Sequence, residues 1–290
     1  MSKVLIGKNN YLFLQNDACR ELEVHNNNIN LVVNDLSRYN KYIDKYLLIV
    51  FPNKSYVYKQ YLPDTFNLKY RPAFDIYTKF FNKHILDGYE YLKDVEDTFY
   101  KTDTHINLKG AYIIYEQFIK KINELFNLNT IMRHIEIKKV DCDNLVSIKL
   151  ALGDLTWEEN KGILQLGDIS DTYYFSDELE QFYCLYQIKN NSNIRFLKQE
   201  YSNLVDCTES LVDTNVSWQV ISKYILYKNN NNGQNTKVLI FYDSFLLQTL
   251  PLYYNMFNEV YLAKSIYSEQ LIDIINPDYI FEFRCERFLF

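Results

Sequence analysis

Short runs of consecutive hydrophobic residues recur along the chain and predict buried β-strands. Four such runs lie at residues 46–51, 238–242, 259–263 and 279–283. Strands that are apolar at nearly every position are typical of parallel sheets, because helices cover both faces of the sheet. The four runs therefore predict a mostly parallel sheet with a helical layer on each side.

Other segments carry hydrophobic residues at every third or fourth position, which is the spacing of one helix face. We expect helices within residues 27–44, 107–126 and 268–276, the last ended by Pro277. Strands that alternate with helices indicate a layered α/β domain. The predicted fold class is a three-layer α/β/α arrangement around a mostly parallel sheet.

The middle of the chain, residues 131–233, has a different pattern. Hydrophobic and polar residues alternate at 134–140, 162–168 and 193–200, between turns rich in Asn and Ser, and such alternation favours strands. The chain shows no internal repeat, heptad pattern or Pro-rich linker. We predict a single domain over residues 1–290, with residues 131–233 as a β-rich insertion in it.

The composition excludes some classes of function but does not identify one. The 290 residues carry a formal net charge of -6, which argues against a nucleic-acid partner because such proteins present a basic face. The high content of Tyr and Phe could serve sugar stacking. Runs of Asn in the same chain favour a general compositional bias instead, so the aromatic content names no substrate.

Cysteine usage and the N-terminus bear on the compartment. Five cysteines are scattered with no CxxC pair, as expected of reduced thiols in a reducing compartment. The apolar stretch at the N-terminus is too short for a signal peptide, and no run approaches the roughly 18 apolar residues of a membrane span. The sequence as written predicts a cytoplasmic protein, or an extracytoplasmic one if a leader has been removed.

An acid and a hydroxyl stand where the run at 238–242 ends. Asp243 and Ser244 follow it directly, and a second apolar segment begins at Phe245. Ligands of open α/β sheets bind outside the carboxyl ends of the strands. Ser244 is therefore a candidate nucleophile, and the backbone N–H of Ser244 or Phe245 is a candidate oxyanion donor. We expect Asp243 to orient this turn rather than to serve as a catalytic acid.

A serine nucleophile needs a base, and His105 is the strongest of the four histidines. Asp103 stands two residues before it, so in an extended or turn conformation the carboxylate can hold one ring nitrogen while the other faces the site. An alternative is that Asp103 or Asn107 only caps the helix that follows. His25 stands in an Asn-rich turn, His84 in a Phe-rich helical run as a packed side chain, and His134 in a strand-like stretch.

Other kinds of site have less support. The chain contains neither GxGxxG nor GxxxxGK[ST], so no phosphate-binding loop is indicated. Asp141, Cys142 and Asp143 could suggest a metal site, but no His or Cys stands at ligand spacing, and a solvated turn is the better interpretation. Asp103 and His105 could also ligate a metal, but a third ligand is missing nearby. We predict no metal.

Five segments together resemble a known family. They read GKNNYLFL, VFPNKSYVYKQYLP, YKTDTHINLKGA, VLIFYDSF and NPDYIFEFRCERFL, and LALGDL at 150–155 adds a shorter match. Their order is similar to that of the SGNH hydrolase-like family of AlgX/AlgJ-type polysaccharide O-acetyltransferases. The resemblance covers both ends of the chain and is weakest over residues 131–233.

The resemblance implies roles for individual residues. Ser244 would be the nucleophile, His105 the base and Asp103 its orienting acid. Arg287 would contact substrate, or else form a salt bridge to Glu286 or another neighbour. Two positions depart from the family pattern: Tyr242 stands where Gly is common before the Asp-Ser pair, and Ile106 replaces the usual Trp after the histidine.

The function that the resemblance implies is transfer of an acyl group, most simply acetyl, to hydroxyls of a polysaccharide or other glycan through an acyl-serine intermediate. No bound cofactor is expected. The acyl donor would be an acetyl thioester or an acetyl group delivered by a membrane-bound partner. Two alternatives stay open, a carbohydrate esterase with the same Ser-His-Asp site and a non-catalytic glycan-binding protein.

Overall fold

The structure is a computed structural model of the chain. It describes residues 4–15, 19–27, 35–68, 71–101, 103–132, 137–141, 171–175, 204–205, 224–228, 236–249, 252–253 and 256–289. The predicted strand segments at 162–168 and 193–200, and His134, lie outside the described residues.

A seven-stranded sheet forms the centre of the molecule. Its spatial order is β4-β3-β11-β9-β10-β8-β7. The strands are β3 (Tyr46–Phe51), β4 (Ile85–Asp87), β7 (Leu204–Val205), β8 (Tyr224–Lys228), β9 (Lys237–Tyr242), β10 (Glu259–Ala263) and β11 (Tyr279–Cys285). The four strands expected from the hydrophobic runs are thus confirmed as β3, β9, β10 and β11.

The five strands from β4 to β10 are parallel, whereas β8 pairs antiparallel with β10 and β7 antiparallel with β8. The last strand in the chain, β11, lies between β3 and β9. Register pairs Cys285 with Phe51, and Phe283 with Tyr242. The carboxyl ends of β3, β9 and β11 therefore meet at one edge of the sheet.

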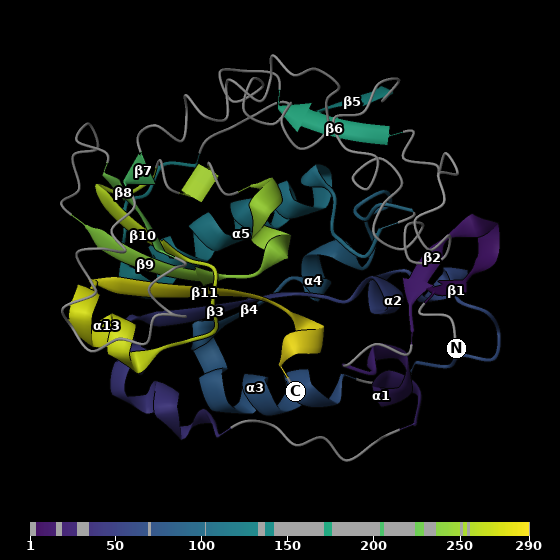
Figure 1. Ribbon diagram of the computed structural model, residues 1–290, viewed down its shortest axis with the longest axis horizontal. Helices are drawn as coiled ribbons and strands as arrows, with labels where there is room; N and C mark the ends of the chain where they lie inside the picture. Colours follow the sequence, from purple (N-terminus) through teal and green to yellow (C-terminus); the bar gives the residue numbers. More distant parts are fainter. Residues whose placement is uncertain are drawn as a thin grey trace.

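Helices cover both faces of this sheet (Figure 1). The long helix α5 (Leu108–Phe126) lies on one side, and α3 (Pro72–Phe81) and α13 (Glu269–Ile275) lie on the other. Alternate residues of the buried strands enter two separate cores, because successive side chains of a strand point to opposite faces. Ile49 and Phe51 pack on the α5 side, and Leu48 and Val50 on the α3 side. The three-layer α/β/α prediction is confirmed.

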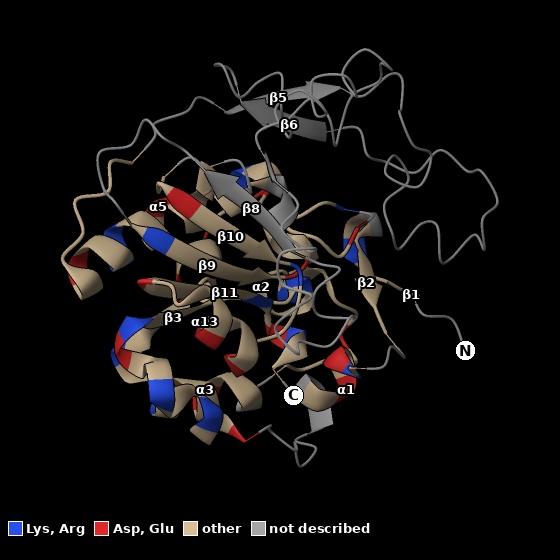
Figure 2. Cartoon of the chain, turned by 60° about the vertical axis from the view of Figure 1, so that its left-hand side comes forward, with Lys and Arg blue, Asp and Glu red and all other residues tan. Residues whose placement is uncertain are grey.

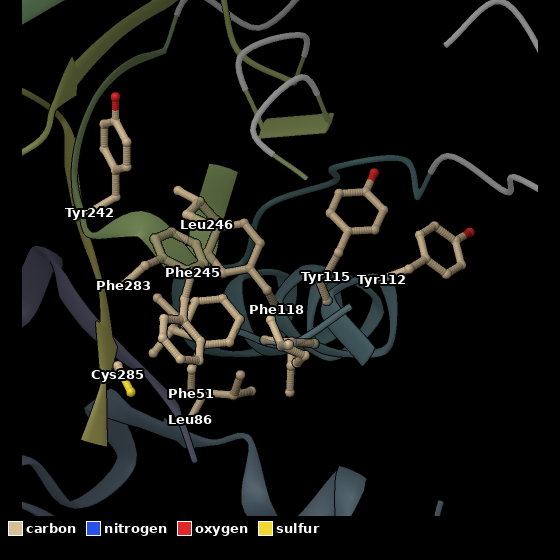
Figure 3. Packing of buried hydrophobic residues seen from close by; sticks show 14 of the residues in the cluster. Phe51, Leu86, Tyr112, Tyr115, Phe118, Tyr242, Phe245, Leu246, Phe283 and Cys285 are labelled. Atoms are coloured by element: carbon tan, nitrogen blue, oxygen red, sulfur yellow. The ribbon is translucent and has the colours of Figure 1, made fainter. Parts of the chain in front are cut away.

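The α5 side holds the larger hydrophobic cluster, seen from close by in Figure 3. Phe118 of α5 lies at its centre, with its ring centroid 4.9 Å from that of Phe281 and 5.4 Å from that of Phe283. Phe245, directly after the candidate nucleophile, is 1% exposed in the same cluster. The turn that carries Ser244 is therefore anchored in the main core.

An N-terminal hairpin and several short helices along the chain complete the fold. A two-stranded antiparallel hairpin pairs β1 (Val4–Ile6) with β2 (Leu12–Leu14). The helices α1 (Glu21–Asn27), α2 (Lys54–Val57) and α4 (Tyr89–Leu92) follow, together with 3-10 helices at Lys8–Asn10, Lys59–Tyr61, Asn82–His84, Ser244–Gln248 and Glu286–Phe288.

Three expectations differ from the structure. Residues 28–34 of the helix expected within 27–44 lie outside the described residues. From Leu36 the chain forms a 3-10 helix, Leu36–Lys45, which begins where Asp35 accepts hydrogen bonds from the backbone and side chain of Ser37. The expected helical run around His84 ends in a 3-10 turn and β4, because Ile85 pairs with Leu48 of β3. His25 lies in α1 rather than in a turn.

The predicted insertion at 131–233 lies mostly outside the described residues, so its extent stays a prediction. Within it, β5 (Ile137–Asp141) pairs antiparallel with β6 (Asp171–Phe175), while β7 and β8 extend the main sheet. Charged residues are marked on α3 and at the first residues of β9 and β10, Lys237 and Glu259, whereas β3 contains none (Figure 2). None of the helices in the described ranges is long and apolar enough to cross a membrane.

Candidate active site

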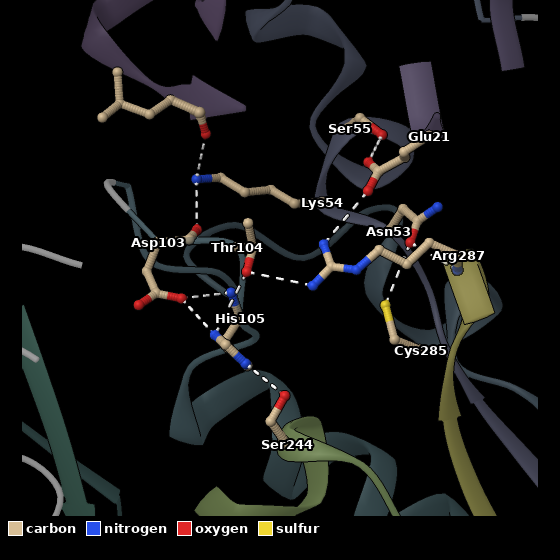
Figure 4. A network of polar contacts seen from close by, with 11 residues as sticks. Glu21, Asn53, Lys54, Ser55, Asp103, Thr104, His105, Ser244, Cys285 and Arg287 are labelled. Carbon is tan, nitrogen blue, oxygen red and sulfur yellow. Dashed lines mark hydrogen bonds and ion pairs between the residues drawn. The ribbon is translucent and has the colours of Figure 1, made fainter. Parts of the chain in front are cut away.

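Ser244, His105 and Asp103 form one hydrogen-bonded chain (Figure 4). Ser244 Oγ lies 2.8 Å from His105 Nε2, and His105 Nδ1 lies 2.6 Å from Asp103 Oδ1. A carboxylate beside Nδ1 selects the tautomer with hydrogen on Nδ1. Nε2 is then the acceptor for the serine proton, which is the arrangement of a nucleophile, a base and an orienting acid.

Local geometry places Asp103 and His105 on one side of the loop before α5. Asp103 Oδ1 accepts the backbone N–H of His105 at 2.7 Å as well as the ring N–H. The side chains of His105 and Asp103 are 26% and 16% exposed, so a substrate can reach the imidazole from solvent. The sequence alternative in which Asp103 caps the helix is not what the structure shows.

Asn107 is the residue that starts α5. Its side-chain oxygen accepts the N–H of Gly110 at 3.0 Å, and its own N–H donates to the Thr98 carbonyl at 3.0 Å. A β-carbon at Gly110 would lie only 2.5 Å from that same carbonyl oxygen, so the close approach requires glycine. The helix start and the preceding segment are therefore locked together, with His105 in the loop between them.

Asp243 holds the turn that presents Ser244. One carboxylate oxygen accepts the N–H of Phe245 at 2.9 Å, and the other accepts the N–H of Cys285 at 2.7 Å. Burial raises the pKa of Asp243, and these two backbone donors act in the opposite direction. The carboxylate links the ends of β9 and β11, and it orients the turn as the sequence predicted.

The same contact bears on the candidate oxyanion donors. The Phe245 N–H already donates to Asp243, so the structure does not bring it toward the site as the sequence had suggested. Ser244 is the first residue of the 3-10 helix Ser244–Gln248, where an N–H has no acceptor within its own helix, so its N–H remains the candidate oxyanion donor. The Phe245 ring has another role: its centroid lies 4.9 Å from that of the His105 ring, which it supports from the core.

Arg287 lies beside the site and is largely buried. Its guanidinium contacts Glu21 at 3.6 Å and Thr104 Oγ1 at 3.5 Å, and it lies 5.5 Å from the Phe245 ring centroid. The sequence left open a salt bridge to Glu286 or to another neighbour; Glu286 pairs with Arg71. Arg287 instead forms its ion pair with Glu21, the first residue of α1, which is distant in the sequence.

A buried ion-pair network, which no spacing in the sequence indicates, joins Arg71 to Asp87 and Glu286. Arg71 donates through Nε to Glu286, at 2.8 and 2.9 Å, and through both terminal nitrogens to Asp87, at 2.6 and 2.9 Å. Burial raises the pKa of Asp87, and Arg71 opposes that shift. The network ties the carboxyl end of β11 to that of β4.

Tyr242 and Ile106, the two residues that depart from the family pattern, both lie in the hydrophobic core. Ile106 is 0% exposed and Tyr242 is 5% exposed, and both belong to the α5-side cluster. Ile106 therefore forms no wall of the site. His84, the packed side chain expected from the sequence, is buried with Nδ1 2.9 Å from the Tyr46 carbonyl. In the described ranges, no three His, Cys, Asp or Glu side chains cluster as metal ligands would.

Comparisons with known proteins support the fold. No family model matches the chain, and no curated protein does. Among solved structures, PatB1 of Bacillus cereus is 17% identical with a TM-score of 0.60, covering 100% of this chain and 97% of that one. PatB1 with a sulfonyl adduct is 16% identical with a TM-score of 0.59, covering 99% and 96%. The O-acetyltransferase domain of Pseudomonas putida AlgJ is 11% identical with a TM-score of 0.51, covering 100% and 92%. The chain thus shares its α/β fold, over nearly its whole length, with these proteins.

Proposed function

We propose that this protein is a serine-dependent O-acyltransferase that places an acyl group, most simply acetyl, on a hydroxyl of a glycan. The observation that carries the proposal is the Ser244–His105–Asp103 chain, with contacts of 2.8 and 2.6 Å. Likeness to the O-acetyltransferase domain of AlgJ supports the choice of acyl transfer among serine-dependent reactions.

Acylation would begin at Ser244. Its proton passes to His105 Nε2 as Oγ attacks the acyl carbonyl, and the resulting imidazolium is stabilised by Asp103. The Ser244 N–H would donate to the developing oxyanion, because the Phe245 N–H already donates to Asp243. The tetrahedral intermediate then expels the leaving group, which takes the proton from His105, and an acyl-serine ester remains.

Transfer would use the same residues in reverse. A glycan hydroxyl gives its proton to His105 Nε2 as its oxygen attacks the acyl carbon, and Ser244 regains the proton when the new ester separates. Transfer requires the acceptor to outcompete water in the site. The donor would be an acetyl thioester or an acetyl group delivered by a membrane-bound partner.

A carbohydrate esterase is the second candidate. The His105 side chain is 26% exposed, so water can approach the same nitrogen that would activate a sugar hydroxyl. Hydrolysis and transfer share the acyl-serine intermediate and differ in whether water or a sugar hydroxyl attacks its acyl carbon.

The test measures the acyl-serine directly. Incubation with a chromogenic acetyl ester, followed by intact-mass spectrometry, should show a single acetyl adduct that maps to Ser244 and is absent in Ser244→Ala. Ser265→Ala is the matched control, because this half-buried serine also follows a strand of the sheet and its hydroxyl donates to the carbonyl of the next residue, Ile266, at 3.1 Å. Glycan acceptors should accelerate loss of the adduct with formation of acetylated glycan. Fast, acceptor-independent turnover would favour the esterase, and no adduct at all would overturn both.

A further inference from the structure

A buried lysine, Lys54, donates hydrogen bonds to the backbone of the candidate catalytic loop. Lys54 is 4% exposed, and its ammonium donates to three backbone carbonyls, those of Leu12 at 2.8 Å, Lys101 at 2.8 Å and Asp103 at 2.9 Å. An ammonium carries three N–H donors, so each carbonyl can receive one. Figure 4 shows the side chain directed toward the Asp103 backbone.

These contacts join three segments that are distant in sequence. Lys54 begins α2, just after β3; Leu12 belongs to β2 of the N-terminal hairpin; and Lys101 and Asp103 belong to the loop that carries His105. The Leu12 N–H also donates to the Lys101 carbonyl at 3.0 Å. The hairpin and the loop thus meet at one buried positive charge.

The loop has little regular structure of its own. An isolated bridge between Phe99 and Ile106 closes it, and the Tyr100 N–H reaches the His105 carbonyl only at 3.4 Å. The Asp103 peptide is held at its carbonyl by Lys54, while its carboxylate holds His105. A rotation of that peptide would turn the carboxylate away from the imidazole.

We propose that Lys54 is a positioning residue, which fixes the Asp103 peptide so that its carboxylate meets His105 Nδ1, and that the N-terminal hairpin is part of this support. The inference rests on the proposed function, because it assigns Lys54 to the same Ser-His-Asp site. Lys54 itself does not contact the reacting atoms.

Lys54→Met tests the proposal, with Lys45→Met as its matched control. Lys45 also donates from its ammonium to a backbone carbonyl, that of Pro277 at 2.7 Å, but it precedes β3 and so lies at the opposite end of the strands from Ser244. Three quantities are measured in each variant: thermal unfolding, the rate at which a sulfonyl fluoride labels Ser244, and the pKa of His105 from NMR titration.

In Lys54→Met we expect labelling of Ser244 to slow by about 100-fold, the usual cost of displacing a catalytic group by about 1 Å. We also expect the pKa of His105 to fall, because its carboxylate partner moves away. Lys45→Met should leave both values unchanged. If Lys54→Met does not fold, Lys54→Arg is used instead. Arginine keeps the buried positive charge, but its planar guanidinium cannot direct N–H groups from a single nitrogen at three carbonyls. The labelling rate of Ser244 and the pKa of His105 should therefore still change.

A folded Lys54 variant with the wild-type labelling rate and the wild-type His105 pKa would overturn the inference. The NMR titration needs no catalysis. If wild-type protein never labels at Ser244, the proposed function fails, while the His105 pKa still reports whether Lys54 holds Asp103 in place.

Discussion

Asp103→Asn probes the electrostatic part of the proposed site with little change in its shape. The amide oxygen can still accept both hydrogen bonds that Asp103 Oδ1 accepts, from the ring at 2.6 Å and from the His105 N–H at 2.7 Å. The substitution removes the negative charge that stabilises the imidazolium once Ser244 has lost its proton. Folding should therefore be preserved while proton transfer becomes harder.

The size of the effect follows from the distances. Two unit charges 4 Å apart attract by about 4 kcal/mol at an effective dielectric constant of 20. Because the side chains are 26% and 16% exposed, solvent screening lowers this to about 3 kcal/mol. That free energy corresponds to a rate loss of roughly 150-fold in acylation of Ser244.

The assay is the rate of Ser244 acylation by an activated acetyl ester, followed by intact mass as a function of pH. In Asp103→Asn the rate should fall by the amount above, with the unfolding midpoint unchanged and the inflection of the pH profile moved to lower pH. Asp243→Asn is the comparison: it should lose stability, by about 2 kcal/mol for one backbone donor left without its charged acceptor. If Asp103→Asn acylates at nearly the wild-type rate and Asp243→Asn abolishes acylation without unfolding, Asp103 is not the orienting acid.

Three further predictions concern the support of the site. Arg71→Met should lower the free energy of unfolding by about 3–5 kcal/mol, because it leaves Glu286 buried without its partner; denaturant titration measures this, and a loss under about 1 kcal/mol would contradict it. Burial raises the pKa of Asp243 above its ordinary value of 3.8, so the protonated carboxyl stabilises the folded state fully below about pH 3.8, and this stabilisation is lost as the pH rises through the folded-state pKa. The difference in unfolding free energy between wild type and Asp243→Asn should therefore change with pH, and a constant difference would count against a raised pKa. Gly110→Ala should destabilise the protein by about 1–3 kcal/mol by pressing a methyl group against the Thr98 carbonyl, as thermal unfolding can show, and an unchanged midpoint would mean that the contact relaxes freely.

Much of the fold could be predicted from residue pattern because the relevant interactions are local or uniform. Residues 46–51 and 238–242 are apolar at nearly every position and so had to be buried on both faces, as β3 and β9 are. Helix α5 follows from its apolar spacing and from Asn107 at its start. The pairing of Asp103 with His105 spans two residues, so chain geometry alone made it a reasonable hypothesis.

Other features depend on segments that are brought together only by the folded chain. His105 and Ser244 are 139 residues apart, and they meet because the loop before α5 packs beside the turn that follows β9. The partners of Lys54, Arg71 and Arg287 come from different elements, and no spacing in the sequence encodes them. Even the Phe245 N–H, a plausible donor from its place after the strand, is taken by Asp243, because the carboxylate is held between β9 and β11. Hydrophobic periodicity reports which face of an element is buried, but strand order and long-range polar pairing arise from packing between elements, so only the tertiary structure could decide them.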